Sequence, residues 1–410
     1  MTTRSHPVFQ DLALGQESGH SLRTTGTVPK RRMVILTEII APYRIPVFNA
    51  LAEQPGVSLH VIFLAESDPS QRQWLVYKDE IRFSYEVLHS WRRRLGKYNF
   101  LLNWGVSEAL RRASPDLVVC GGYNYLASWN CLWWARRKKV PILLWVESTE
   151  WDLRNRYSLV EFLKKRFMED CDGFVVPGKS SAQYVRSHQA TKAVFTAPNA
   201  VDSGLFARRA AAARRDGEAN RKALGLPARF FLSVGRLVVE KGVLDLLEAY
   251  RELSQESKSE WGLVFIGDGP ARAELERRAS AIQPGRVRVA GFIQRDELAS
   301  YYGLAEVFVF PTRSDPWGLV VNEALACGLP VITTDIAGCT ADLVENGWNG
   351  FVFRAGDVPA LATAMNTLAE SSELREQMAR HSLERVEEYS PAAWAEGMAQ
   401  AMKLVLRESA

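Results

Sequence analysis

Long hydrophobic runs are missing from this 410-residue sequence. Its apolar stretches, such as residues 33–37 and 231–235, are far shorter than the roughly 18 consecutive apolar residues that a membrane-spanning helix needs. Residues 1–32 also lack the apolar core of a signal peptide, and we expect a disordered or variable N-terminal arm there. The sequence therefore predicts a protein that is neither exported nor membrane-spanning.

Cysteine is scarce as well. The five cysteines are scattered along the chain and form no CxxC motif or Cys/His cluster. This distribution argues against a disulfide framework or a zinc site, and a reducing cytoplasmic compartment is the simplest expectation.

The composition that remains is that of a folded soluble protein, with 47% hydrophobic and 24% charged residues. The length suggests two or three domains. Charge is distributed unevenly, because residues 1–202 carry a formal net charge of +8 and residues 203–410 carry −4. The first half also holds eight of the twelve tryptophans.

Short apolar runs alternate with amphipathic stretches along the whole chain, which favours parallel sheets covered by helices. The alternation is interrupted by an Ala/Arg-rich piece after Asp202 and then resumes. We therefore expect an α/β protein with two doubly wound, Rossmann-like domains facing a cleft, the default binding site. The expected units are residues 33–203, residues 204–390 and a C-terminal helix over 391–410 that packs back toward the first domain.

Two cations follow the first expected strand of the second domain. Gly235 allows a tight turn after this strand, and Arg236 and Lys241 stand between it and the next helix. A diphosphate suits this arrangement because guanidinium, ammonium and free helical N–H groups all favour negative charge. The alternative is that Lys241 only solvates the helix start while Arg236 pairs with Glu240.

An acid stands in an otherwise apolar helix of the same domain. Glu323 lies one turn inside a helix whose first N–H groups, near Gly318, Leu319 and Val320, point toward the same strand edge. Its carboxylate can accept hydrogen bonds from ribose hydroxyls, and Asp315 in the preceding loop can do the same at the other end of a ligand. The alternative is that a neighbouring backbone group or arginine holds Glu323.

The motifs "GRLVVEKG" and "DPWGLVVNEALACGLPVI", with "IGDGP" between them, resemble those of retaining glycosyltransferases of family 4, which have the GT-B arrangement. The resemblance covers roughly residues 196–390. It implies that Arg236 and Lys241 hold the diphosphate of a UDP- or GDP-sugar and stabilise its departure, and that Glu323 binds the ribose. It also implies that Asp315, with the backbone amides from Trp317 onward, contacts the transferred sugar.

Asp315 replaces the glutamate that is usual in that family, which shortens the side chain by about 1.5 Å and leaves the identity of the sugar open. The resemblance implies no cofactor. The Asp170-x-Asp172 motif looks like the metal-binding motif of the other major glycosyltransferase fold, but we interpret its acids as caps of a chain reversal. We expect no metal requirement, because the two cations and a helix dipole can stabilise the leaving group.

The first domain resembles the family less closely. Glu147 ends a middle strand where an acceptor hydroxyl is expected, and it is our candidate for orienting or deprotonating that hydroxyl; a structural role is the alternative. The backbone at Gly122 and the side chain of Arg44 are further candidates for the acceptor side. Arg44 could instead cap a surface.

Basic runs at residues 92–94, 136–139 and 164–166 are flanked by aromatic residues, a mixture typical of interfacial helices. No nucleic-acid recognition motif accompanies them. We therefore expect peripheral binding to an anionic membrane, on the inner face of the plasma membrane, and a lipid-linked or polysaccharide acceptor. Solvated helix faces and a soluble acceptor are the alternatives. A non-catalytic sugar-nucleotide or glycan-binding scaffold, an epimerase and a phosphorylase-like enzyme also stay open.

Overall fold

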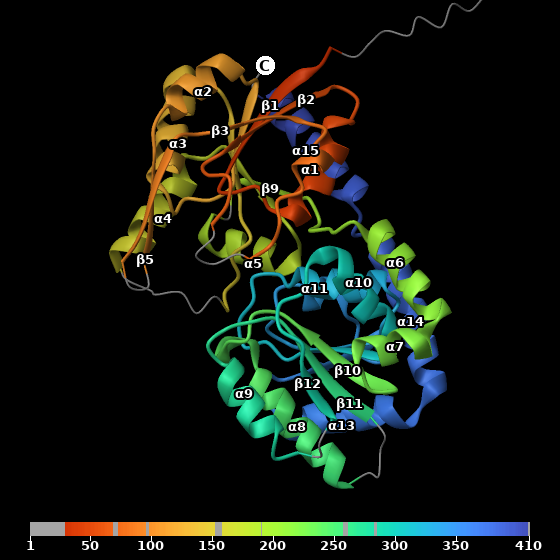
Figure 1. Ribbon diagram of the computed structural model, residues 1–410. Helices are drawn as coiled ribbons and strands as arrows, with labels where there is room; N and C mark the ends of the chain where they lie inside the picture. Colours follow the sequence, from red (N-terminus) through yellow and green to blue (C-terminus); the bar gives the residue numbers. More distant parts are fainter. Residues whose placement is uncertain are drawn as a thin grey trace, which may run out of the picture.

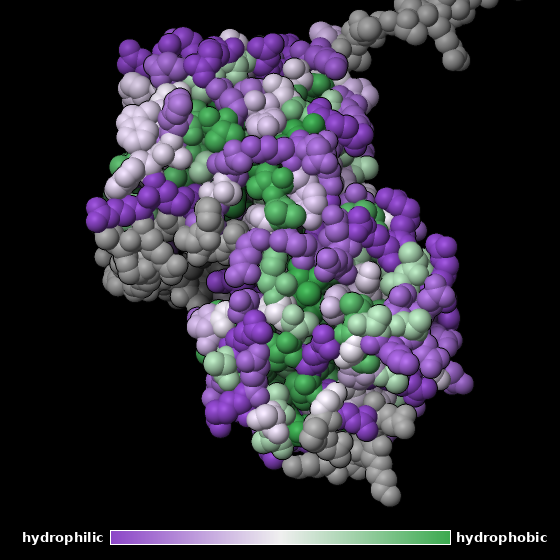
Figure 2. Space-filling view, in the orientation of Figure 1, coloured by the Kyte–Doolittle hydropathy of each residue, from purple (hydrophilic) through white to green (hydrophobic). Residues whose placement is uncertain are grey.

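The computed structural model shows two lobes, one above the other in Figure 1. It describes residues 29–68, 73–95, 98–151, 158–189, 191–256, 261–282 and 285–408. Figure 2 shows the same two lobes in space-filling form, with hydrophilic residues over much of this face. Each lobe is built around one large sheet, so the predicted two-domain α/β architecture is confirmed.

The first lobe contains a seven-stranded parallel sheet in the order β3-β2-β1-β6-β7-β8-β9. Its strands are β1 (Arg31–Thr37), β2 (Val57–Phe63), β3 (Ser84–Val87), β6 (Leu117–Cys120), β7 (Ile142–Trp145), β8 (Gly173–Val176) and β9 (Ala193–Thr196). Both faces are covered by helices, which explains why several strands are buried along their whole length.

The helices of this lobe divide between the two faces of the sheet. One face packs on α1 (Ile45–Ala52) and on α15 (Pro391–Glu408), the last helix of the chain. The other face packs on α2 (Val106–Ala113), α3 (Leu126–Lys138), α4 (Ser158–Asp170) and α5 (Lys179–His188). Trp394 of α15 is fully buried against Phe48 of α1, so the chain returns from the second lobe to complete the core of the first.

A two-stranded antiparallel hairpin, β4 (Ser90–Leu95) and β5 (Tyr98–Asn103), lies beside this sheet. It contains the first basic run, so the expectation of an interfacial helix there is wrong. Charged residues alternate poorly with apolar ones in this segment, and the sequence offers no two-residue Asn-Gly or Asp-Gly turn that would have indicated a hairpin. The other two basic runs do lie at the end of α3 and within α4.

The second lobe contains a six-stranded parallel sheet in the order β12-β11-β10-β13-β14-β15. Its strands are β10 (Arg229–Val234), β11 (Trp261–Ile266), β12 (Val287–Val289), β13 (Val307–Phe310), β14 (Val331–Thr334) and β15 (Gly350–Phe353). All six coincide with apolar runs that the sequence predicts as strands.

Helices again cover both faces of this sheet. They are α6 (Ser203–Arg215), α7 (Gly217–Leu224), α8 (Val243–Glu256), α9 (Arg272–Ala279), α10 (Arg295–Leu304), α11 (Leu319–Ala326), α12 (Thr340–Leu343), α13 (Val358–Glu370) and α14 (Ser372–Glu387). The cluster of α8, α9 and α13 packs on one face, and that of α6, α10 and α11 packs on the other. The Ala/Arg-rich piece between the domains therefore forms helices α6 and α7.

Most of the predicted N-terminal arm lies outside the described residues. Its last two residues, Arg31 and Arg32, belong instead to β1. No helix in the described part of the chain is both long and apolar enough to cross a membrane.

Candidate active site

The carboxyl ends of the parallel strands form one edge of each sheet. Ligands of such sheets bind at this edge, between the two neighbouring strands from which the chain continues in opposite directions. In the second sheet β10 lies beside β13, and the chain continues from them toward opposite sides of the sheet. In the first sheet β1 lies beside β6 in the same way. Gly235 and Arg236 follow β10, and Asp315 follows β13, so the structure brings the predicted donor residues to one edge.

Two glycines shape this edge. A side chain at Gly318, where φ is +96°, would place its Cβ 2.6 Å from the ring of Phe310. Gly242, with φ of +65°, is closer still, because a Cβ there would lie 2.0 Å from the carbonyl oxygen of Pro311. Each position requires the left-handed region and leaves no room for a side chain, so glycine lets α11 and α8 begin against β13.

Lys241 and Asp315 form an ion pair across the edge. The Lys241 Nζ lies 2.5 Å from the Asp315 Oδ2 and donates to the carbonyl of Ser314 at 2.9 Å. The other oxygen of Asp315, Oδ1, accepts from the backbone N–H of Trp317 at 3.0 Å. Lys241 is therefore held by Asp315 and Ser314 and does not merely solvate a helix start, and the short side chain of Asp315 turns toward the cation.

Arg236 is the exposed member of the basic pair. In the described residues its guanidinium has no ion pair or hydrogen bond, and the alternative pairing with Glu240 is not observed. An exposed cation at a strand edge can accept an anionic ligand without first breaking a protein contact. The geometry suits the predicted diphosphate role.

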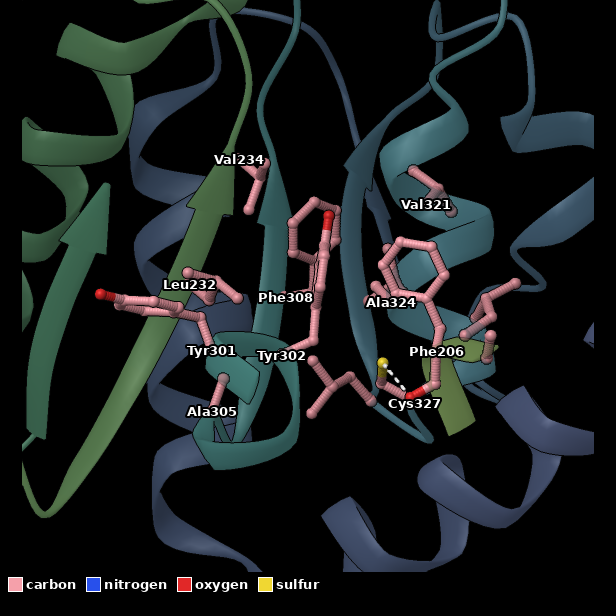
Figure 3. Packing of buried hydrophobic residues seen from close by; sticks show 14 of the residues in the cluster. Phe206, Leu232, Val234, Tyr301, Tyr302, Ala305, Phe308, Val321, Ala324 and Cys327 are labelled. Carbon is pink, nitrogen blue, oxygen red and sulfur yellow. Dashed lines mark hydrogen bonds between the residues drawn. The ribbon is translucent and has the colours of Figure 1, made fainter. Parts of the chain in front are cut away.

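Glu323 is held by the hydroxyl of Tyr302, which donates to its Oε2 at 2.8 Å. Burial raises the pKa of Glu323 from 4.5 to about 7, and the hydrogen bond from Tyr302 opposes that shift. Figure 3 shows Tyr302 standing beside Phe308 of β13, close to Ala324 of α11. Tyr302 is fully buried, and its ring centroid lies 5.6 Å from that of Phe308. Among the described residues no arginine or backbone group binds the Glu323 carboxyl, so the partner named in the alternative is wrong, although a neighbouring side chain does hold it.

On the acceptor side, Arg44 and Glu147 are ion-paired. The Arg44 Nη1 also donates to the Oδ1 of Asn199 at 2.9 Å, and the Nδ2 of Asn199 donates to the Glu147 Oε1 at 3.1 Å. The Arg44 guanidinium lies 4.2 Å from the ring centroid of Trp145. Arg44 is thus largely buried among its partners and does not cap a surface. Gly122 follows β6, the neighbour of β1, and a Cβ there would meet nothing within 4 Å.

The expected donor contact of Trp317 concerns its backbone amide and stays a prediction, whereas its side chain supports the site. Its side chain is buried, and its Nε1 donates to the Oδ1 of Asn322 at 2.9 Å. Its backbone N–H is the group that binds Asp315. We therefore place Trp317 among the residues that support the site.

Sequence reasoning also missed Tyr302, Asn199 and Asn322 as parts of the site. The two asparagines are buried, and asparagine is seldom buried without a hydrogen-bonding reason. The signal that could have found Asn322 is its position beside Glu323 in an apolar helix. Nothing in the sequence around Tyr302 links it to Glu323, 21 residues away.

The side chain of Asp172, in the turn between α4 and β8, binds groups outside that turn, so the predicted capping of the chain reversal is not observed for it. Its Oδ2 accepts from the backbone N–H of Ile142 at 2.8 Å, and its Oδ1 accepts from Arg136 at 3.1 Å. Asp170, at the end of α4, lies 3.4 Å from Arg166. Across the described ranges no group of three or more His, Cys, Asp or Glu residues could hold a metal ion.

A recess of about 760 Å³ opens between the lobes beside α5 and α12. Its lining comes from both lobes and consists of Glu150, Gly178, Lys179, Ala182, Gln183, Arg186, Ser187, Thr196 and Asp342. The backbone N–H of Lys179 donates to Asp342 at 2.9 Å across the boundary, and burial raises the pKa of Asp342.

Comparison with known proteins gives consistent matches. A family model described as "Glycosyl transferases group 1" matches residues 216–385, and one described as "Glycosyltransferase Family 4" matches residues 48–205. Together these models cover most of the two lobes.

Three curated relatives illustrate the range of matches. Sulfoquinovosyl transferase SQD2 of Arabidopsis thaliana is 36% identical over 38% of this chain and 30% of its own length. Alpha-D-kanosaminyltransferase of Streptomyces kanamyceticus is 35% identical over 40% of this chain and 42% of its own length. Alpha-monoglucosyldiacylglycerol synthase of Streptococcus pneumoniae is 28% identical over 49% and 48%. The chain thus spans less than half the length of each of these relatives.

The solved structures share the fold over nearly the whole chain. Anabaena Alr3699/HepE, crystallised with UDP, superposes with a TM-score of 0.70 at 17% identity and covers 91% of this chain and 99% of its own. A glycosyltransferase from Rickettsia africae also reaches a TM-score of 0.70, at 13% identity, with coverage of 92% and 99%. At these identities the likeness shows the fold.

Proposed function

Because the chain belongs to glycosyltransferase family 4, we propose that it moves a hexose from a UDP- or GDP-sugar to a hydroxyl of a lipid-linked or polysaccharide acceptor, with the anomeric configuration retained. One observation carries the proposal. Arg236 follows β10, and Lys241 pairs with Asp315 in the loop between β13 and α11, so both cations lie at the β10–β13 edge, with Glu323 one turn into α11. This combination suits a diphosphate joined to a ribose.

In the proposed reaction the bond between the anomeric carbon and the diphosphate breaks, and its electron pair leaves with the diphosphate. Arg236 and Lys241 stabilise the charge that develops there. The acceptor hydroxyl attacks from the face that the leaving group vacates, and its proton passes to an oxygen of the departing phosphate. Glu147, kept in place by Arg44 and Asn199, orients the acceptor hydroxyl.

No metal ion is needed in this proposal, because two cations and the first N–H groups of α11 supply the positive charge. The sugar itself is set beside Asp315, whose pairing with Lys241 leaves more room than a glutamate would. The UDP and UDP-glucose named with HepE structures support a nucleotide-sugar donor. The relatives' names cover several different sugars, so they support no single one.

Turnover tests this function directly. The purified protein, in EDTA, is incubated with UDP- and GDP-hexoses and an acceptor panel of polyprenyl-linked sugars, diacylglycerol and free saccharides, and release of UDP or GDP is followed. We expect acceptor-dependent release from an α-linked donor and an α-linked product by NMR. Release that requires an added metal, or an inverted product, would refute the mechanism. Release that consumes phosphate would favour the phosphorylase-like alternative.

We also propose that the acceptor is reached at an anionic membrane through the face formed by β4–β5, α3 and α4, here called the lateral face. These elements, with Trp104 directly after β5, carry many exposed large apolar side chains: Trp91, Phe100, Leu102, Trp104, Leu126, Trp133, Val160, Phe162 and Leu163. Helix α3 contacts both β5 and α4, so the three elements form one surface, on the left of the upper lobe in Figure 1. The relative from Streptococcus pneumoniae carries diacylglycerol in its name, which supports a lipid acceptor.

Cations accompany these apolar groups, and each near an anionic bilayer contributes about 1 kcal/mol. Arg137, whose guanidinium lies 5.4 Å from the ring centroid of Trp133, is exposed, as are Lys138 and Lys139. Arg92 differs, because it is ion-paired with the buried Asp68 and also contacts Glu38. Neutralising the whole 92–94 run would therefore unfold local structure as well as remove charge.

Vesicle sedimentation tests the lateral face. Wild-type protein should bind vesicles containing phosphatidylglycerol and bind pure phosphatidylcholine less, with binding weakened by salt. The triple change Arg137→Gln, Lys138→Gln and Lys139→Gln should release it.

The matched control is the triple change Arg208→Gln, Arg215→Gln and Lys222→Gln, which removes the same charge from exposed positions on the second lobe. It should leave vesicle binding unchanged. Equal loss in both triple variants would show a general charge effect and refute the lateral face. No binding of wild type to either vesicle would favour a soluble acceptor.

A further inference from the structure

A chain of hydrogen bonds crosses the boundary between the two lobes. Asn199, in the segment that joins them, binds Arg44 and Glu147 of the first lobe through its side chain. The backbone carbonyl of Asn199 accepts from the Nδ2 of Asn322 in α11, at 2.9 Å. The Oδ1 of Asn322 accepts from the Trp317 Nε1. The chain thus runs from the acceptor side to the donor loop.

Both amide groups have a fixed orientation. The indole of Trp317 can only donate and a backbone carbonyl can only accept, so a reversed Asn322 amide would lose both bonds. The Asn199 amide is fixed in the same way between the guanidinium of Arg44 and the carboxylate of Glu147. The two asparagines are 1% and 0% exposed, and each lost bond would leave a buried polar group unpaired.

The ends of this chain are the two candidate reacting regions. At one end, Asn199 contacts Glu147, which orients the acceptor hydroxyl in the proposed function. At the other end, the backbone N–H of Trp317 holds Asp315, which in turn pairs with Lys241. A change at Asn322 therefore reaches both ends.

We propose that Asn199 and Asn322 are positioning residues, which set the acceptor-side carboxylate against the donor loop across the lobe boundary. The inference rests on the proposed function for its catalytic consequence. Its structural part, the mechanical link between Glu147 and the Asp315 loop, stands on the contacts alone. Neither asparagine needs to touch substrate.

Asn322→Asp is the sharpest perturbation. It keeps the shape and the bond from Trp317, but it places a carboxylate oxygen against the carbonyl of Asn199 in place of the N–H donor. Asn349→Asp is the matched control, because Asn349 is equally buried in the same lobe and its amide bonds, to Leu343 and Glu345, are local. Both changes bury an extra carboxylate oxygen.

Hydrogen exchange detected by mass spectrometry measures the coupling between Asn322 and the first lobe without any substrate. Asn322→Asp should speed amide exchange in peptides covering residues 145–150 of the other lobe, whereas Asn349→Asp should leave them unchanged. Equal exchange in both variants would overturn the proposal. If Asn322→Asp does not fold, Trp317→Phe removes the indole donor to Asn322, together with part of the ring volume, and should give the same exchange pattern.

Enzyme kinetics measure the effect of the same variant on catalysis. A displacement of the reacting groups by about 1 Å costs up to about a hundredfold in rate, so kcat should fall at least about tenfold in Asn322→Asp. Calorimetric Kd for UDP and GDP should stay within about twofold, because Asn322→Asp keeps the Oδ1 that accepts from the Trp317 indole and so leaves the donor loop in place, while it removes the bond to the carbonyl of Asn199. A loss confined to nucleotide affinity would overturn the positioning role. Absence of UDP and GDP binding in wild type would instead refute the proposed function. The hydrogen-exchange experiment would still test whether Asn322 couples the two lobes.

Discussion

The carboxyl group of Glu323 should make nucleotide binding depend on pH. Ribose hydroxyls bind best to the ionised carboxylate, but burial raises the pKa of Glu323 to about 7 in the free protein. Below that pH the group is mostly protonated and must lose its proton as the nucleotide binds. The affinity for UDP or GDP should therefore fall as the pH drops below 7.

The size of the effect follows from the pKa. Suppose that two ribose hydrogen bonds return the pKa of Glu323 from about 7 to its ordinary 4.5. At 1.36 kcal/mol per pKa unit, nucleotide binding then favours the ionised carboxylate by about 3 kcal/mol more than in the free protein. The affinity should then decline about tenfold for each pH unit between 7 and 5. At pH 6 close to one proton should be released for each nucleotide bound.

Isothermal calorimetry at pH 6, in two buffers with different ionisation enthalpies, measures that proton directly. The terminal phosphate of a nucleoside diphosphate also titrates near pH 6, so the result needs a matched variant. Glu323→Gln keeps the phosphate contribution and removes the carboxyl. The difference in proton release between wild type and Glu323→Gln should be close to one. Identical proton release in both would refute the assignment of Glu323 to the ribose.

Three further outcomes are expected. Lys241→Ala and Arg236→Ala should each weaken UDP or GDP binding by roughly 1.5–3 kcal/mol in calorimetry, since each removes a charge-assisted bond, and unchanged affinity in both would remove the diphosphate assignment. Gly318→Ala should lower the free energy of unfolding in urea by more than Gly105→Ala, because both have positive φ but only the former clashes. Because the pKa of Glu323 is higher in the folded protein, its contribution to the free energy of unfolding falls as the pH rises from about 4.5 to 7. Glu323→Gln should abolish this contribution, and identical pH dependence of unfolding in wild type and Glu323→Gln would contradict it.

The sheets were predictable because each strand of the second lobe is a short apolar run, and buried parallel strands require such runs. The placement of the candidate donor residues was predictable for a related reason. Arg236, Lys241 and Asp315 follow strands, and the carboxyl ends of parallel strands share one edge. Sequence position alone therefore brings them together.

The hairpin β4–β5 and the partners of the site residues were not predictable in this way. The hydrogen bond from Tyr302 to Glu323 joins α10 to α11, and that of Asn322 to Asn199 joins the two lobes. Such contacts depend on how helices and lobes pack, which local periodicity does not encode. The same packing buries the Trp317 indole against Asn322.

Donor binding is the most direct test of the central claim, that the β10–β13 edge holds the diphosphate of a nucleotide sugar. A thermal-shift panel of UDP- and GDP-sugars, measured in EDTA, reports it without knowledge of the acceptor. A donor at a hundredfold excess over its Kd should stabilise the folded protein by about 2.7 kcal/mol, and the shift should disappear in the Arg236→Ala, Lys241→Ala double variant. No shift with any donor, or an equal shift in the double variant, would contradict the account.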